Sequence, residues 1–234
     1  IIDGPYLCGH YHTIGGWVKQ MHATQQPGFA EVELGDWKYE RRIRLASIDN
    51  QLFNFVDIKY GEFPIALLTN PKRPEYNMPK YEPIERIARS THLRVIAFSN
   101  STIKRVELSI DAGQHYTMKR VSDDSPLYVL PWPNDYSTGY HKVEIYVEDS
   151  ANLSRVYSQG FSLDGSKNDF TLGAKILLRA YFRTCVMTMF FSIVAICTLP
   201  LLVLRMIVHR HQGVGLKKHY RGTFLYDLHL LSNI

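Results

Sequence analysis

The feature that most constrains this chain is the apolar run Thr184–Leu204, which contains no charged residue. As a helix it is long enough to cross a hydrocarbon core of roughly 30 Å, for which about 20 residues suffice. Its Leu, Ile, Val and Phe residues each favour insertion by about 0.3–0.6 kcal/mol, and no central charge opposes them. A core helix of a soluble domain normally carries a polar stripe. We therefore predict a transmembrane helix that divides the chain between two sides of a bilayer.

Charge and cysteine content exclude two other classes of protein. The 234 residues carry a net charge of +5, but Lys and Arg are scattered and become denser only around the apolar run. Anionic lipid headgroups explain this distribution better than nucleic acid does, so no nucleic-acid partner is expected. Two of the three cysteines, Cys185 and Cys197, lie within the apolar run, and no disulfide framework is predicted. The chain starts at Ile1 without a leader sequence, so we expect a fragment or a processed product.

Two histidines separated by one residue are the clearest chemical feature of the first third. A short predicted strand ends at Gly9, and His10 and His12 follow it. Neutral imidazole is a good ligand for zinc, iron and manganese, and a glycine lets the backbone approach without a side chain in the way. Two solvated histidines would have the same spacing, so both interpretations stay open at this point. His22 has no motif around it and is a weak further candidate.

The run Leu7–Thr13, LCGHYHT, resembles the last motif, G-H-x-H, of calcineurin-like metallophosphoesterases. With Gly28–Tyr60, the chain more narrowly resembles the transmembrane protein 62 family, and the resemblance covers nearly its whole length. It implies part of a metallophosphoesterase domain, an immunoglobulin-like domain and membrane helices, in that order. It also implies that His10 binds one metal ion and His12 the other, in a centre that hydrolyses phosphate esters.

The donor set on this chain is incomplete for such a centre. The earlier motifs of the family, D-x-H, G-D and G-N-H-D/E, would lie before Ile1, and Gly35-Asp36 follows the histidines and is explained by a turn. Two metal ions about 3.5–4 Å apart need a bridging carboxylate and further ligands. We therefore expect two divalent metal ions only in the complete protein. No tightly bound metal, no catalysis and no catalytic residue are assigned to this chain alone.

Alternating apolar and polar residues predict two successive groups of strands. Ala30–Leu34, Arg42–Leu45 and Leu52–Tyr60 have the period of strands with one buried face and are expected to form the edge of a larger sandwich, poorly stabilised by itself. The proline-rich stretch Asn70–Pro83 is expected to be a surface loop. From Phe63–Leu68 onward, seven or so short strands separated by turns predict a two-sheet sandwich of about 100 residues, of immunoglobulin or fibronectin type.

Two aromatic residues and two glycosylation sequons stand out in the predicted sandwich. Trp132 and Tyr146 are expected to pack in the core or at its edge rather than to form a recognition surface. Asn100-Ser101-Thr102 and Asn152-Leu153-Ser154 are sequons at predicted turns, and they favour a lumenal or extracellular sandwich.

The orientation of the span rests on the sequons and on the resemblance. Positive charges are similar in number on both sides of the apolar run, so the positive-inside rule does not fix it. We expect the amino-terminal domains outside the cell or in a lumen and the basic tail in the cytosol. Lys175, Arg179 and Arg183 recur every four residues, which predicts three cations on one helical face before the span.

We therefore expect a mainly β chain with a partial metallophosphoesterase sandwich edge, an immunoglobulin-like β-sandwich and a transmembrane α-helix. The expected boundaries are 1–60 for the metallophosphoesterase piece, 61–165 for the sandwich, 166–183 for a linker and basic helix start, 184–204 for the span, and 205–234 for a basic tail that approaches a further span. The leading hypothesis is a fragment of a membrane protein with a metallophosphoesterase-like ectodomain. The alternative is a non-catalytic, membrane-anchored binding or structural protein. The lipid bilayer is the expected partner, and a protein partner of the sandwich is left open.

Overall fold

The computed structural model describes residues 4–11, 20–39, 41–168, 170–179 and 181–210. The chain divides into two compact units, Ile1–Arg179 and Ala180–Ile234. The first unit contains the described strands, and the second contains one long apolar helix. The prediction of a mainly β chain with sandwich-like sheets and one apolar helix is confirmed.

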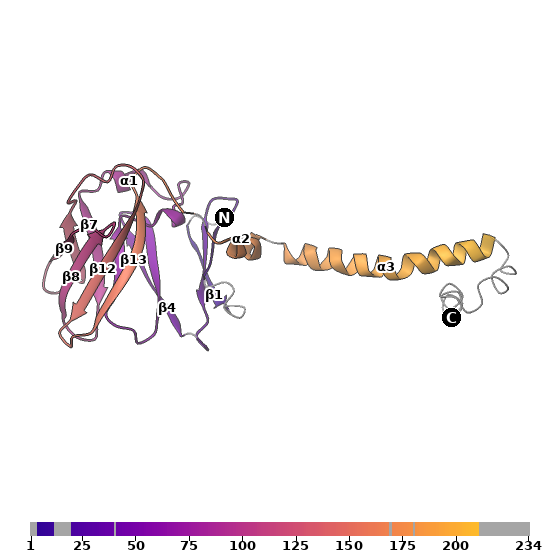
Figure 1. Ribbon diagram of the computed structural model, residues 1–234, viewed down its shortest axis with the longest axis horizontal. Helices are drawn as coiled ribbons and strands as arrows, with labels where there is room; N and C mark the ends of the chain where they lie inside the picture. The colour runs from indigo at the N-terminus through magenta and orange to yellow at the C-terminus, as the bar shows by residue number, and fades with distance from the viewer. Residues whose placement is uncertain (1–3, 12–19, 40, 169, 180, 211–234) are drawn as a thin grey trace. The chain divides into compact units, whose positions relative to one another are not determined.

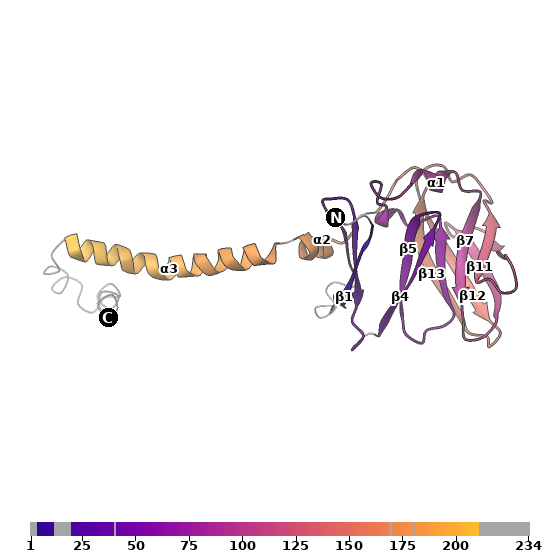
Figure 2. The ribbon, with the colours of Figure 1, turned by 180° about the vertical axis from the view of Figure 1, so that it is seen from behind.

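Two four-stranded antiparallel sheets form the larger part of the first unit (Figures 1 and 2). One sheet has the order β10-β11-β7-β6 and consists of β10 (Lys119–Arg120), β11 (Leu127–Pro131), β7 (His92–Phe98) and β6 (Ile65–Asn70). The other has the order β13-β12-β8-β9 and consists of β13 (Ser154–Ser162), β12 (Tyr140–Asp149), β8 (Ile103–Ile110) and β9 (His115–Thr117). This strand order corresponds to the immunoglobulin-type sandwich, with β9 added to the second sheet.

The core between these sheets is built from residues at alternate strand positions. Val143, Ile145 and Val147 of β12 are fully buried, because every second side chain of a strand points to the same face. Trp132 packs against the core, and its ring centroid lies 5.5 Å from that of Phe161. Its indole N–H donates to the carbonyl of Ser90 at 2.8 Å, which agrees with the packing role expected from the sequence.

The strands before the sandwich form a sheet and a hairpin. The sheet has the order β1-β3-β2 and consists of β1 (Tyr6–Tyr11), β3 (Ala30–Gly35) and β2 (Met21–Thr24). β1 pairs with β3 in parallel, whereas β2 pairs with β3 in antiparallel orientation. The hairpin consists of β4 (Arg42–Asp49) and β5 (Leu52–Lys59), in antiparallel orientation. Asp49 accepts hydrogen bonds from Thr69 and from Arg94, so the hairpin is attached to the sandwich.

The proline-rich stretch 70–83 is not a surface loop, and that expectation is wrong. Tyr76, in the short helix η2 (Pro74–Tyr76), and Met78 are buried in one cluster with Val32 and Phe55. Although prolines remove backbone donors, apolar side chains between them fill the gap between β3 and β5. The stretch is followed by the single helical turn α1 (Glu85–Ala88).

Lys72 and Glu82 from this stretch form a buried ion pair. Lys72 is 0% exposed, and the carboxylate of Glu82 also accepts the backbone N–H of Phe53 at 2.7 Å and that of Met78 at 3.1 Å. Burial lowers the pKa of Lys72 to about 8, against the opposing effect of Glu82. Glu82 therefore joins the stretch to β5.

Two helices follow the sandwich. α2 (Leu172–Arg179) packs on β2 within the first unit, where Ala174, Leu177 and Leu178 contact Met21. α3 (Phe182–Arg210) forms the second unit. The two helices are separate elements, so Lys175 and Arg179 share a helix whereas Arg183 belongs to the next one. The prediction that all three cations lie on one helical face is wrong, because Arg183 belongs to a separate helix.

α3 confirms the predicted membrane helix. Residues Arg183–Ile207 are long and apolar enough to cross a membrane, and they include the whole predicted run. An 18-residue window within them has a mean hydropathy of 2.4. The helix continues through Arg205 to Arg210, beyond the predicted end of the span. Ser192 and Thr198 donate their hydroxyl protons to carbonyls four residues earlier, at 2.8 Å in both cases. These two hydroxyl groups are thus satisfied within the helix, as a lipid environment requires.

Candidate functional site

His10, the first histidine of the H-x-H motif, belongs to β1, which ends beside the parallel strand β3. β1 runs parallel to β3 and Tyr11 pairs with Gly35, so the carboxyl ends of the two strands meet. His10 is a residue of β1, but its side chain and the whole of His12 lie outside what the structure describes. Ligands of sheets with parallel strands bind beyond the carboxyl ends. Metal binding by His10 and His12 stays a prediction, at an edge where such sites occur.

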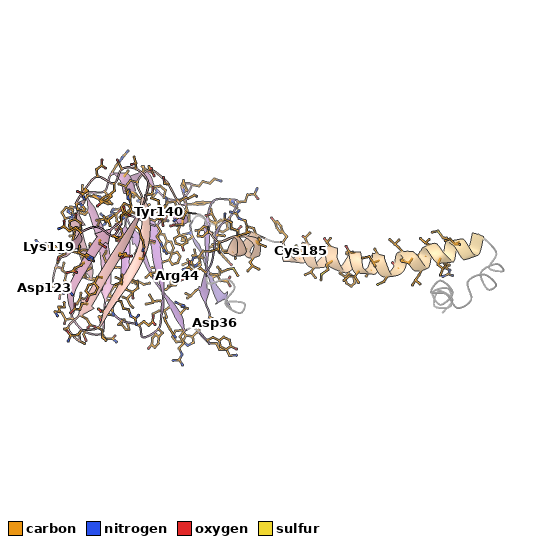
Figure 3. All side chains as sticks on the ribbon, in the orientation of Figure 1. Asp36, Arg44, Lys119, Asp123, Tyr140 and Cys185 are labelled. Carbon is orange, nitrogen blue, oxygen red and sulfur yellow. The ribbon has the colours of Figure 1, made fainter. Side chains whose placement is uncertain are left out.

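The turn after β3 forms an open depression beside this edge. Asp36 is buried and accepts the backbone N–H of Tyr39 at 2.6 Å, which fixes the turn expected at Gly35-Asp36. The depression has a volume of about 1170 Å³. Figure 3 shows Asp36 at this end of the strands. The described residues that line it are Gly9, Leu34, Gly35, Asp36, Trp37, Lys38, Tyr39 and Arg42.

This depression offers two cations and exposed aromatic rings. Lys38 and Arg42 are suited to an anionic group such as a phosphate, and Arg provides planar, paired donors. The Trp37 ring is 56% exposed and lies edge-on to the Tyr60 ring, with the centroids 5.3 Å apart. Among the described residues, no group of three or more His, Cys, Asp or Glu side chains could hold a metal ion.

His22 lies in a buried polar group that we call the His22 cluster, made of His22, Arg44, Asp57 and Tyr76. Its Nδ1 and the hydroxyl oxygen of Tyr76 are 2.8 Å apart, and its Nε2 is 3.6 Å from Asp57 Oδ2. Arg44 donates from Nε to Asp57 Oδ1 at 2.6 Å and from Nη2 to Oδ2 at 2.8 Å. The cluster therefore joins β2, β4, β5 and the proline-rich stretch.

Burial and pairing set the charge states in the His22 cluster. Burial lowers the pKa of His22, although Asp57 opposes this, so the neutral ring is favoured. Burial would raise the pKa of Asp57, but hydrogen bonds from Arg44 and His22 outweigh it and hold the pKa below its ordinary value. Burial also raises the pKa of Tyr76 to about 12. Near neutral pH the cluster thus holds one ion pair and two neutral rings.

The position of Arg44 corrects the expected faces of β4. The alternation predicts Ile43 and Leu45 on a buried face and Arg44 in solvent, yet only 8% of the Arg44 side chain is exposed. Its Nη1 donates to the carbonyl of Val32 at 2.8 Å, and its guanidinium lies 4.3 Å from the centre of the Phe55 ring. Figure 3 shows Arg44 among the strands of the first unit. Arg44 therefore joins β3 to the hairpin, because Asp57 compensates its charge there.

The His22 cluster resembles a catalytic arrangement in composition but not in access. His22 is 3% exposed, so a substrate cannot reach the ring in this conformation. The ring is also held between the edges of Phe55 and Tyr76, with centroids 5.3 and 5.5 Å away. The cluster is a structural connection between the sheet of β1 and the rest of the unit.

The relationship of this chain to known proteins is decided by one curated relative. Transmembrane protein 62 from Mus musculus is 38% identical over 232 residues, which cover 98% of the chain. The chain belongs to the transmembrane protein 62 family. It spans about a third of the length of this relative, 35%. Membership in the transmembrane protein 62 family, together with α3, identifies the chain as part of an integral membrane protein with the lipid bilayer as its partner.

Two other comparisons add little to this assignment to the transmembrane protein 62 family. No family model matches the chain. Among solved structures, CopC from Methylosinus trichosporium OB3b is similar over 35% of this chain and 79% of its own, at 14% identity. The TM-score of 0.26 is too low to support an argument about the chain.

The two predicted sequons of this transmembrane protein 62 family member lie side by side. Asn100 is exposed between β7 and β8, and Asn152 is exposed between β12 and β13. The turns are hydrogen bonded to each other, because Ser150 N–H donates to the carbonyl of Thr102 at 2.8 Å and Ser99 donates to Asp149 at 2.6 Å. Both acceptor asparagines are therefore at the same end of the sandwich and open to solvent.

Proposed function

We propose that the chain is part of a membrane-anchored phosphoesterase whose metal centre includes His10 and His12. The supporting observation is the parallel pairing of β1 and β3, which brings the carboxyl end of the H-x-H strand beside the depression lined by Lys38 and Arg42. In this proposal His10 and His12 donate imidazole nitrogens to two divalent ions, and the two cationic side chains attract the phosphate ester. When bound, the ions supply an activated water and orient the ester.

The donor set fits such a centre only in part. Two imidazoles are suitable ligands, but a two-metal site also takes a bridging carboxylate and further donors. The described part of the chain contains no cluster that would supply them. The remaining ligands must come from elsewhere in the complete protein, and the mouse relative is about three times as long as this chain. The proposal therefore concerns the full-length protein.

The test uses full-length protein purified from animal cells. We expect the His12→Ala variant to lose at least about tenfold in metal content and in hydrolysis of a phosphodiester, since even outer-shell changes at metal sites cost about 10–100-fold. His115→Ala, an exposed histidine of β9, is the matched control and should behave like the wild type. Equal metal content and activity in His12→Ala and wild type would contradict the role of His12.

The alternative is a non-catalytic, membrane-anchored binding or structural protein, with an immunoglobulin-like sandwich over residues 61–165 as the contact surface. The specific observation in its favour is the pair of four-stranded antiparallel sheets packed around one apolar core. Wild-type full-length protein with neither bound metal nor phosphodiesterase activity would favour it.

We further propose that the first unit is lumenal or extracellular and that the tail after α3 is cytosolic. The two sequon turns support this orientation, since both acceptor asparagines are exposed. In animal cells the wild type should migrate faster after glycosidase treatment, and Asn100→Gln or Asn152→Gln should each reduce that shift. Asn134→Gln, an exposed asparagine outside any sequon, is the control. A wild type that migrates identically with and without glycosidase contradicts this orientation.

A further inference from the structure

The helix α2 has one face packed on the sheet and one face without a described protein partner for its apolar side chains. Ala174, Leu177 and Leu178 face β2. Leu172 and Ile176, four residues apart and therefore on one side of the helix, are 72% and 56% exposed. A helix of eight residues is too short to be stable by itself, so its contacts with β2 must hold it in place.

Two hydrogen bonds fix α2 on the sheet in addition to these apolar contacts. Arg179 donates from Nη2 to the carbonyl of Thr24 at 2.7 Å. Gln25 donates from its side chain to the carbonyl of Leu178 at 3.3 Å. The exposed apolar face is therefore presented by a rigidly attached helix rather than by a free linker.

The chain itself brings this face close to a bilayer. Only residues 180 and 181 separate the end of α2 from the start of α3, whose span begins at Arg183. Three residue steps cover at most about 11 Å, so the chain keeps the end of α2 near the surface of the membrane that α3 enters. Tyr181, which is 79% exposed, has the amphipathic ring typical of that region.

The charges around the exposed face match an anionic surface. Lys175 and Arg179 flank Ile176 on the helix, and Arg183 follows at the start of α3. A helix with Lys and Arg beside an exposed apolar stripe lies in the plane of the interface, with the apolar residues at the boundary between headgroups and acyl chains. Anionic lipids attract such juxtamembrane cations within a Debye length of the surface.

We propose that the Leu172 and Ile176 face of α2 is a membrane-contact surface that inserts into the interface of a bilayer containing anionic phospholipid. Because α2 is attached to β2, this contact holds the sheet β1-β3-β2 next to the membrane surface. The proposal is independent of the proposed phosphoesterase activity, since none of its residues belongs to the H-x-H edge or to the depression.

The test measures the depth of position 176 in a bilayer. In the whole chain with Cys8→Ser, Cys185→Ser and Cys197→Ser, an environment-sensitive fluorophore is attached at Ile176→Cys or, as a matched control, at Val156→Cys. Val156 is an apolar residue of β13 that is 60% exposed. The protein is reconstituted into vesicles of phosphatidylcholine with phosphatidylserine, or of phosphatidylcholine alone, with or without bromine on the acyl chains.

We expect brominated lipid to reduce the emission from position 176 about twofold in vesicles with phosphatidylserine, since the stripe sits about 5–10 Å deep. Emission from position 156 should not change, and aqueous iodide should quench position 156 more than position 176. Equal iodide quenching at the two positions overturns the proposal. Protection from iodide without quenching by brominated lipid overturns it in favour of a protein partner. Equal bromine quenching in both lipid compositions overturns the assignment of anionic lipid.

Discussion

Replacing Glu82 with alanine is expected to lower the free energy of unfolding of the first unit by about 3–5 kcal/mol, because one partner of a buried ion pair is removed. Lys72 would keep a buried charge without compensation, as its side chain is 0% exposed. The backbone N–H groups of Phe53 and Met78 would also lose their acceptor. The measurement is urea unfolding of the whole chain in detergent, with tryptophan fluorescence as the signal that monitors unfolding.

Three further variants separate the charge from the backbone contacts of Glu82. Lys72→Met should cost less than Glu82→Ala, because two backbone donors continue to bind the carboxylate. The double variant Lys72→Met/Glu82→Leu removes both charges and should also be milder than Glu82→Ala. The exposed Glu85→Ala in α1 is the control and should lie within about 0.5 kcal/mol of the wild type. A loss in Glu82→Ala no larger than in Glu85→Ala would show that the pair does not stabilise the fold.

Asp57→Ala is expected to be the second most damaging change, with a loss of about 3 kcal/mol, the lower end for a broken buried pair because Asp57 is 18% exposed. Arg44 would keep its contacts with backbone carbonyls of β3 and with the Phe55 ring but lose its carboxylate partner, and His22 would lose its acidic neighbour. The same unfolding measurement applies, at a pH above the ordinary histidine pKa of about 6.5 so that His22 is neutral in both states.

An exposed ion pair of the sandwich provides the comparison for Asp57. Lys142 and Glu144 are 58% and 40% exposed, and their Nζ and Oε1 atoms are 2.6 Å apart. Exposed pairs contribute about 0–1 kcal/mol, so Glu144→Ala should be nearly neutral. Arg44→Met/Asp57→Leu should be more stable than Asp57→Ala, since no charge is left alone. If Asp57→Ala and Glu144→Ala cost the same, the His22 cluster does not join the sheet to the hairpin.

The ion pairs Lys72–Glu82 and Arg44–Asp57 matter for the candidate site because they attach the sheet that contains β1 to the rest of the first unit. The H-x-H strand belongs to a sheet of three strands, which alone buries little apolar surface. The His22 cluster connects this sheet to the hairpin, and Glu82 connects the hairpin to the proline-rich stretch. The first 60 residues therefore depend on contacts with the following part of the unit. This dependence is consistent with the expectation that they are poorly stabilised by themselves.

The sequence alone predicted the features that follow from local periodicity and composition. The apolar run predicted α3, because insertion depends on a sum over neighbouring residues that needs no tertiary contact. Alternation predicted the strands of the sandwich, and the sequons were found at turns. The resemblance also predicted the family correctly on the residues around the H-x-H motif.

The tertiary structure alone decided where charges are buried and which turns meet. Arg44 is buried because Asp57 of β5 compensates its charge, and the proline-rich stretch is packed because its Glu82 binds the backbone of Phe53. Periodicity within one strand contains no information on such partners. The packing of α2 against β2 likewise joins residues that are distant in sequence. The amino-acid sequence thus determined the membrane helix and the β content, whereas burial of charge was decided by long-range pairing, since a buried ion is stable only where the fold brings its counterion.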